Sequence, residues 1–368
     1  MIKLKDLCYL FINNKIFIFR YCVSLYSRLC VTFSVCGKTR FLDNRNLFQQ
    51  IRWSRFFVLS FILFNTFFVY ADDFEGKKVL CIDSYHEGYE WSDSVISGVV
   101  DGLKGSGVEL RIYRMDTKRN ISEEFKKQAA ILANDMIKKY KPDLIIAADD
   151  NASKYLIEPY YKDIDLPIVF CGVNWDETVY GYPYSNATGM VEVSLISKLI
   201  EELLNYSKGN RIGFLGGDVL TDRKEAESYK KIFHITLTEM YAKTFSEWKR
   251  YFLKMQNEVD ILIVYNDAGV EGWDAVEAEV FVKENTFIPT GSVLDWMAKY
   301  VLMTLAKEGE EQGEYAAQTA LRILNGEDPK DIPIVRNKNG KVYLNINIAD
   351  KLGVVLRPRL LKQAEIIF

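Results

Sequence analysis

Carboxylate, amide and aromatic side chains follow directly on short apolar runs of the chain, the position at which parallel strands end and ligands bind. Amide and carboxylate oxygens can hold a cationic or donor-rich group, while indole and phenol rings stack on a ring or cover a cation. The pattern predicts a site for a small polar solute that carries an amine or an aromatic portion. The candidate contacts are Ser84, Tyr85, His86, Trp91, Asp116, Asp149, Asp150, Asn151, Asn174, Trp175, Asp218, Asn266, Asp267, Asp295 and Trp296.

These polar side chains have a second interpretation, because Asp, Asn and Ser at the start of a helix commonly accept its first N–H groups. The run Asp149-Asp150-Asn151 supplies three polar side chains where a cap needs one. Two adjacent carboxylates also repel each other unless a positive or donating group lies nearby. The run as a whole therefore favours ligand contact. Four tryptophans are open to two interpretations, as walls of the site or as core residues: Trp91, Trp175, Trp273 and Trp296.

The sequence lacks the common motifs of catalysis and of metal or cofactor binding. It has two histidines, His86 and His234, and no HExxH, CxxC, GxSxG or GxxxxGK[ST] pattern. The glycines of segment 213–217 do not have the GxGxxG spacing of a dinucleotide site. We therefore predict a binding protein without enzymatic activity, cofactor or metal. The alternative is an extracytoplasmic enzyme in which His86 acts as general base with a nearby carboxylate.

Apolar runs without polar alternation indicate strands covered on both faces, as in parallel sheets. These runs alternate with segments of 3.6-residue periodicity, which predicts an α/β fold with two Rossmann-like lobes, each built on a parallel sheet and joined by a hinge. Asn120 with Glu123 predicts a capping box at the start of one helix. The expected strands are 79–82, 110–113, 144–148, 168–173, 212–215, 261–265 and 287–288, and the expected helices are 91–104, 122–140, 152–160, 194–207, 222–233, 245–256 and 272–284.

The strand–helix units are too numerous for one compact sheet and suit two lobes. Segment 176–189, which contains two glycines and a proline, has the composition of a connection between them. The expected elements that follow are helices 293–307 and 312–324 and a short strand 341–346. The resulting assignment is 72–175 plus 292–335 for the first lobe and 176–291 plus 336–368 for the second.

The first 71 residues differ in composition from the remainder. An apolar run of about 15 residues follows Arg52 and Arg55 and ends at Ala71, the arrangement of a cleavable signal peptide at 51–71, with cleavage after Ala71. A retained membrane anchor is the alternative, but a spanning helix needs roughly 20 apolar residues. Residues 1–50 have no clear periodicity and are interpreted as an extension produced by a start codon placed too far upstream.

Cysteine usage and charge agree with export. Four of the six cysteines precede residue 51, which leaves Cys81 and Cys171 in apolar runs as buried core residues that could pair if their strands are neighbours. Residues 1–71 hold ten Lys and Arg but two Asp, so the acidic excess, a net charge of −11, lies in residues 72–368. Such a protein would repel nucleic acid and anionic membrane surfaces.

Four segments resemble the substrate-binding proteins of ABC transporters, the family that includes the bacterial tryptophan/tyrosine-binding proteins. They are Val79-Leu80-Cys81-Ile82-Asp83-Ser84-Tyr85-His86, Pro167-Ile168-Val169-Phe170-Cys171-Gly172-Val173-Asn174, Arg211-Ile212-Gly213-Phe214-Leu215 and the most distinctive, 313–329, followed by Ile332-Pro333-Ile334. The resemblance implies a type I periplasmic binding protein fold, with three crossovers between the lobes, a small-molecule ligand closed between them, and a membrane permease as partner. It also implies a periplasmic or extracytoplasmic location, and we expect a monomer.

The chain departs from the aromatic-amino-acid binders at two loops. Where they have a Thr-Pro-Ala type loop, this chain has Asp149-Asp150-Asn151, and where they have an Asn-Ser pair it has Thr221-Asp222-Arg223. Both departures argue against tryptophan or tyrosine and favour a ligand with positive charge or several hydroxyl or amine donors. Segment 84–92 also resembles extracytoplasmic sensor domains, so a ligand-sensing module for a sensor kinase or chemoreceptor is the alternative to transport.

Overall fold

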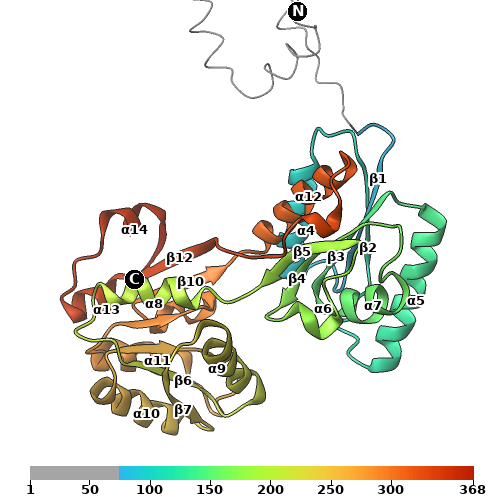
Figure 1. Ribbon diagram of the computed structural model, residues 1–368. Coiled ribbons are helices and arrows are strands. Elements are labelled where there is room, and N and C mark those ends of the chain that lie inside the picture. Colours follow the sequence, from blue (N-terminus) through green and yellow to red (C-terminus); the bar gives the residue numbers. More distant parts are fainter. Residues whose placement is uncertain (1–73) are drawn as a thin grey trace, which may run out of the picture. The chain divides into compact units, whose positions relative to one another are not determined.

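The computed structural model describes residues 74–368. The extension 1–50 and the signal peptide 51–71 lie outside the described residues, so these two assignments stay predictions. Figure 1 shows two α/β lobes, each with its own sheet. The α/β class with parallel-dominated sheets in two lobes is therefore confirmed.

The first sheet has six strands, all paired in parallel, in the order β11-β5-β4-β3-β1-β2. Alternate side chains of β1 enter two separate cores: Leu80 and Ile82 on one face, Val79 and Cys81 on the other. This two-sided burial is the reason that the strand sequence lacks alternation. The strands are β1 (Lys78–Asp83), β2 (Glu109–Arg114), β3 (Leu144–Ala148), β4 (Ile168–Asn174), β5 (Ala187–Glu192) and β11 (Val335–Arg336).

The second sheet has seven strands in the order β13-β12-β10-β9-β8-β6-β7, and the pair β10–β12 is antiparallel. Its core contains the large buried rings of Phe214, Trp248 and Phe252. The strands are β6 (Ile212–Gly217), β7 (Leu237–Ala242), β8 (Ile261–Val264), β9 (Thr290–Ser292), β10 (Met303–Lys307), β12 (Gly340–Asn345) and β13 (Ala364–Ile367).

Helices cover both sheets. The first lobe has α4 (Glu90–Leu103), α5 (Glu123–Tyr140), the continuous helical segment α6 (Asp149–Ala152), η1 (Ser153–Ile157) and α7 (Glu158–Tyr160), and α12 (Gly309–Leu324). The second has α8 (Ile196–Leu204), α9 (Leu220–Phe233), α10 (Phe245–Glu258), α11 (Ala275–Asn285), α13 (Ile346–Leu352) and α14 (Pro358–Gln363). Short 3₁₀ segments are η2 (Glu177–Tyr180), η3 (Asp295–Tyr300) and η4 (Pro329–Asp331). Within residues 74–368, no helix has the length and apolar character that a membrane span requires.

Helix α12 comes late in the chain but packs on α4 of the first lobe (Figure 1). The two backbones approach so closely that a Cβ on Gly313 would overlap the carbonyl oxygen of Val95, and one on Gly98 would overlap that of Glu310. Glycine is required at these helical positions because of the close approach, although it lowers helix propensity. The first residue of the distinctive segment 313–329 is therefore explained by this contact.

The chain passes between the sheets three times, after β5, after β10 and after β11. Two of these passages are joined by Asn337, which is 4% exposed. Its Oδ1 accepts from the Val193 N–H at 2.7 Å, and its Nδ2 donates to the Val193 carbonyl oxygen at 3.1 Å. Three crossovers are what the resemblance implied.

The expected lobe boundaries differ from the structure at two strands. β5 belongs to the first sheet, although residues 187–192 were expected in the connection between lobes. Gly189 lies there because β4 approaches closely, with the Phe170 carbonyl oxygen where a Cβ would be, and not because of a turn. β10 belongs to the second sheet, although residues 293–307 were expected to be one helix. The segment instead forms η3 and then a strand whose first four residues are buried.

The expected capping box was also wrong, whereas the expected burial of the two cysteines is confirmed. The helix α5 is capped by Ser122, which accepts from the Phe125 N–H, while the Asn120 amide donates to Asp116. Cys81 and Cys171 are both free and buried. They lie on β1 and β4, which are separated by β3, so their strands are not neighbours.

Candidate functional site

The carboxyl ends of β1, β3, β4 and β5 meet at one edge of the first sheet. The register pairs Asp83 with Ala148 and Asn174 with Glu192. This edge therefore brings the residues that follow β1 and β3 next to the last residues of β4 and β5. The predicted group at Ser84–His86, Asp149–Asn151 and Asn174 is assembled here by the sheet itself.

Ser84 has a structural role at this edge. Its hydroxyl donates to the Ala148 carbonyl oxygen at 2.6 Å and accepts from the Ala152 N–H at 2.8 Å, and the residue is fully buried. It joins the end of β1 to the first turn after β3. Both hydrogen bonds are internal to the lobe, so the predicted ligand contact at this hydroxyl is not what the structure supports.

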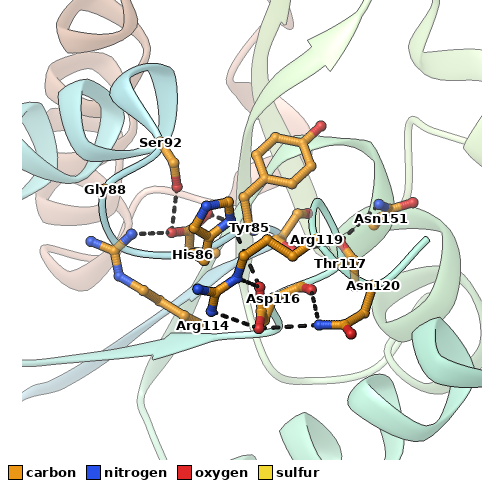
Figure 2. Close-up of polar contacts among 12 residues, drawn as sticks. Tyr85, His86, Gly88, Ser92, Arg114, Asp116, Thr117, Arg119, Asn120 and Asn151 are labelled. Atoms are coloured by element: carbon orange, nitrogen blue, oxygen red, sulfur yellow. Dashed lines mark hydrogen bonds and ion pairs between the residues drawn. The ribbon is translucent and has the colours of Figure 1, made fainter.

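Asp116 and its neighbours form a separate polar group (Figure 2). The Asp116 carboxylate accepts from Arg119 Nε and Nη2 at 2.7 and 2.8 Å and from the Asn120 amide at 3.2 Å. The hydrogen bond from Arg119 lowers the pKa of Asp116. His86 Nδ1 lies 3.7 Å from the Asp116 carboxylate and has no hydrogen-bond partner within residues 74–368. The Asn151 side-chain amide donates to Thr117 Oγ1 at 2.8 Å. This hydrogen bond is internal to the first lobe.

Two tyrosines lie beside this group. The rings of Tyr85 and Tyr89 meet edge to face with centroids 5.3 Å apart. The Lys118 ammonium lies 5.2 and 4.7 Å from their respective centroids, within cation–π range. Burial raises the pKa of Tyr85, and Asp149 and Asp150 add to the shift.

Asp149 is the most deeply buried of the predicted carboxylates, at 1% exposure. Its backbone has φ of 70°, a left-handed conformation that Asp and Asn tolerate better than most residues. Oδ1 accepts from the Trp91 indole N–H at 3.0 Å, whereas Oδ2 has no hydrogen-bond partner in the described part of the chain. Burial, followed by the charges of Glu192 and Asp83, raises the pKa of Asp149 well above its usual value.

Asp150 and Asn174 bind each other. Asp150 Oδ1 accepts from the Asn174 backbone N–H at 3.1 Å, and Oδ2 accepts from the Asn174 side-chain amide at 2.8 Å. This pair ties the start of α6 to the end of β4. Both residues remain partly exposed, and the Asn174 amide oxygen is not used in this pair, so it remains able to accept a hydrogen bond.

Two further carboxylates, which sequence reasoning missed, lie at the hinge. Glu192 is the last residue of β5 and accepts from the ammonium of Lys307, the last residue of β10. Glu225, on α9, accepts from the hydroxyl of Ser194 in the first crossover. Burial raises the pKa of both carboxyl groups. Burial alone would lower the pKa of Lys307, but the Glu192 carboxylate outweighs it and raises the pKa.

We call Asp149, Glu192 and Glu225, together with Lys307, the acid cluster. After burial, the charge of Glu192 raises the pKa of Asp149, and the charges of Asp150 and Glu225 raise the pKa of Glu192. Asp149 and Glu192 come from the first lobe and Glu225 from the second. The acid cluster therefore holds three buried carboxyl groups but one basic side chain, so its acidic groups outnumber its basic ones.

Aromatic rings surround the acid cluster from both lobes. The Lys307 ammonium lies 5.4 Å from the centroid of the Trp91 ring. Trp175 follows β4 but packs edge to face on Tyr229 of α9, with centroids 6.0 Å apart. Burial raises the pKa of Tyr265, and Glu225 adds to the shift, which places this phenol near the acid cluster from the end of β8. Trp91, Trp175 and Tyr265 are all partly exposed, as a wall of a site requires.

The remaining predicted contacts lie elsewhere in the second lobe. Asp218 is paired with Arg223 at 2.5 Å and lies 3.8 Å from Lys243, and the Asn266 side chain accepts from the Ala268 N–H at 3.0 Å. Asp267 belongs to the same turn through its backbone carbonyl. Asp295 accepts from the Trp296 N–H at 2.9 Å in η3, where Trp296 is 55% exposed. None of these five makes a recorded hydrogen bond or ion pair to the acid cluster among residues 74–368.

A hollow of about 580 Å³ opens at the other end of the second sheet. It is lined by Ile212 and Thr236, next to the amino ends of β6 and β7, and by His234, Ser197 and Ile200. This end is opposite to the carboxyl edge that carries the polar groups. Within residues 74–368, no group of three or more His, Cys, Asp or Glu is placed to hold a metal ion.

A family model described as "ABC transporter substrate binding protein" matches residues 89–367. The chain belongs to this family. Substrate-binding proteins of ABC transporters bind small ligands, work with a membrane permease and are periplasmic or extracytoplasmic. The family is one of solute-binding proteins and not of enzymes, and the match gives no support to the alternative of a sensing module.

Two solved structures of substrate-binding proteins, both with TM-scores above 0.5, show the same fold. One is the ligand-free, open structure of a substrate-binding protein with adhesive properties from Clostridium difficile, at 18% identity and a TM-score of 0.60, covering 79% of this chain and 99% of that one. A periplasmic ribose ABC transporter protein from Conexibacter woesei has 12% identity and a TM-score of 0.51, covering 77% and 97%. An L-Trp complex from Streptococcus pneumonia has 18% identity and a TM-score of 0.46, covering 79% and 99%. No curated protein gives a significant match.

Proposed function

We propose that this substrate-binding protein captures a small solute with a protonated amine, together with an apolar or ring portion, and delivers it to an ABC permease. The observation that carries the proposal is the acid excess of the acid cluster: it holds three buried carboxylates and one lysine, which pairs with Glu192 and is influenced by the charges of Glu225 and Asp149. Buried charges are retained when they are paired, and an unpaired one is costly. A ligand ammonium would supply both the missing positive charge and the missing hydrogen-bond donors.

Asp149 is the carboxylate best placed for that ammonium. Its Oδ1 is held by the Trp91 indole, which fixes the orientation of the carboxyl group, while Oδ2 lacks a donor within residues 74–368. An ammonium has three N–H donors, so one can bind Oδ2 while the others reach neighbouring acceptors. The Asn174 amide oxygen at the same sheet edge is a suitable second acceptor.

The aromatic residues favour the ring portion and the cation equally. Trp91, Trp175 and Tyr265 are partly exposed around buried acids, an arrangement in which a cation gains about 0.5–2 kcal/mol from a ring face. The same acids would repel the carboxylate of a zwitterionic amino acid. The charges therefore favour an amine over tryptophan or tyrosine.

The test is a titration that follows the intrinsic tryptophan fluorescence of the protein, to which Trp91 and Trp175 contribute, with benzylamine and the neutral benzyl alcohol as a matched pair of probes. The expected result is a saturable change with benzylamine and a much weaker one with benzyl alcohol. Asp149→Asn should weaken benzylamine binding by about tenfold or more, because a hydrogen bond to a charged group contributes about 1.5–3 kcal/mol. Asp218→Asn, which removes a carboxylate paired with Arg223 outside the acid cluster, should leave the affinity unchanged.

Equal binding of the alcohol and the amine, or no saturable response to either by the folded protein, would refute the proposal. We also infer that residues 51–71 direct export and that cleavage follows Ala71. Sequencing the amino terminus of the mature protein tests this inference, and a mature chain that retains residues before Asp72 would contradict it.

A further inference from the structure

Lys307 is the basic member of the acid cluster. It ends β10 of the second sheet and donates to Glu192, which ends β5 of the first, so its ammonium joins the two lobes next to their crossovers. The Lys307 side chain is 27% exposed and that of Glu192 is 5% exposed. The lysine therefore neutralises the buried carboxylate while part of its own side chain stays exposed.

The same ammonium also lies over an aromatic face. It is 5.4 Å from the centroid of the Trp91 ring, within cation–π range. The N–H of that indole binds Asp149 Oδ1 at 3.0 Å. Lys307 thus occupies one carboxylate and one ring face, both of which a second ligand cation would otherwise use.

Asp149 contributes a fully buried acceptor without a partner in the described part of the chain. Asp149 is 1% exposed, and its Oδ2 receives no hydrogen bond within residues 74–368. Glu225, by contrast, is bound by the Ser194 hydroxyl, and Glu192 by Lys307. Among the described residues, Asp149 Oδ2 is therefore free to accept from a ligand cation, whereas the Glu192 carboxylate is already engaged by Lys307.

We propose that Lys307 makes the site selective for solutes with one ammonium group over solutes with two. It does so because it neutralises Glu192 and covers the face of Trp91. This inference rests on the proposed function, because it presumes that the site binds amines. Removal of the lysine exposes a carboxylate and a ring face for a second ammonium group. Removal of the carboxylate leaves a positive charge that repels one.

The experiment compares benzylamine with 1,4-bis(aminomethyl)benzene, which has the same ring and a second ammonium group. The measured quantity is the ratio of the two affinities for the full protein and its variants. Lys307→Gln should raise the preference for the diamine at least about tenfold, the effect of about 1.4 kcal/mol. Glu192→Gln should shift the ratio in the opposite direction by a similar factor.

The double variant Lys307→Gln with Glu192→Gln separates charge from packing. It removes both partners and leaves the net charge of the acid cluster unchanged, so the ratio should return to within about threefold of the original. Lys341→Gln is the control, because Lys341 lies on the neighbouring strand β12 and pairs with Glu365 at the surface. It should leave the ratio unchanged.

The possible outcomes are distinct. If Lys307→Gln does not fold because Glu192 is left unpaired, the shift in Glu192→Gln and its reversal in the double variant still decide the question. Unchanged ratios in the folded variants, or a double variant that keeps the shift of a single one, overturn the role of Lys307 while the original protein still binds amines. If the original protein binds neither amine, the proposed function is overturned and this inference falls with it.

Discussion

Replacing Asp149 with Asn should change the pH dependence of stability in a defined direction. The carboxyl group is 1% exposed, accepts one hydrogen bond from Trp91 and lies near the carboxylates of Glu192, Asp83 and Asp150, with Lys307 as the compensating charge. Burial and these acids raise its pKa in the native state, so the native state holds the proton more tightly than the unfolded chain does. The free energy of unfolding therefore falls as pH rises from the unfolded pKa, near 3.9, to the native one.

The magnitude follows from proton linkage. Between the two pKa values, one additional bound proton in the native state lowers the free energy of unfolding by up to about 1.4 kcal/mol for each pH unit. Asn retains the acceptor for the Trp91 N–H and tolerates the left-handed backbone, but it cannot ionise. Asp149→Asn should therefore become progressively more stable than the original protein as pH rises from about 4, a relative gain of about 3–5 °C in Tm for each pH unit.

The assay is thermal unfolding of both ligand-free proteins across this pH range, with Asp163→Asn as a matched control. Asp163 also has positive φ, but it is exposed, and hydrogen bonds from the backbone N–H and hydroxyl of Ser185 lower its pKa. This lowered pKa stabilises the native state above the unfolded pKa, and the contribution is lost as pH falls through the native one. The control should therefore become less stable relative to the original protein as pH rises. A constant Tm difference between Asp149→Asn and the original protein at all pH values would refute the assigned environment.

Three further substitutions test the fold and the site. Arg114→Met should lower the free energy of unfolding by about 3 kcal/mol in urea, because Arg114 Nη1 binds the buried carboxylate of Asp83 at 2.9 Å and its loss leaves that charge poorly compensated. Gly313→Ala should cost about 1–3 kcal/mol by the same measurement, because the added methyl group overlaps the Val95 carbonyl oxygen. Trp91→Phe should weaken benzylamine binding by about tenfold in the fluorescence titration, because it removes the N–H that orients the buried carboxylate.

Each of these substitutions has a control. Lys77→Met breaks an exposed ion pair with Asp143 and should change stability by no more than about 1 kcal/mol. Glu314→Ala lies next to Gly313 on the exposed side of α12 and should stay within about 0.5 kcal/mol of the original protein. Trp296→Phe, at an exposed position of η3, should not alter amine affinity. If any control has an effect as large as its counterpart, the corresponding contact does not have the role assigned to it.

Much of the fold could be predicted from the sequence because the central strands are buried on both faces. Runs such as 144–148 and 168–173 are apolar throughout, and the structure places both in the middle of the first sheet. β5 was missed because it contains Gly189, required by the close approach of β4, and reads as a loop. β10 was missed because its short apolar sequence continues that of η3, and periodicity does not separate a buried strand from a helix in so few residues.

Site residues could be predicted from the sequence only where they follow a strand that the sequence also reveals. Asp149, Asp150 and Asn174 follow strands that the sequence reveals, and the structure brings them to one edge. Glu192 and Lys307 end the two strands that were missed, and their contact depends on two crossovers far apart in sequence. Polar type alone did not separate these roles, because Ser84 and Asp218 follow strands as well but are used in internal contacts.

The contact between α4 and α12 has a consequence for the order in which the chain can fold. Val95 and Val99 of α4 share a core with Ala316 and Ala320, which lie more than 200 residues further along the chain. During synthesis, the core of the first lobe therefore cannot form completely until most of the second lobe has been made. The nascent chain therefore stays incompletely folded until late in synthesis. An incompletely folded chain is the form that a secretion channel can translocate.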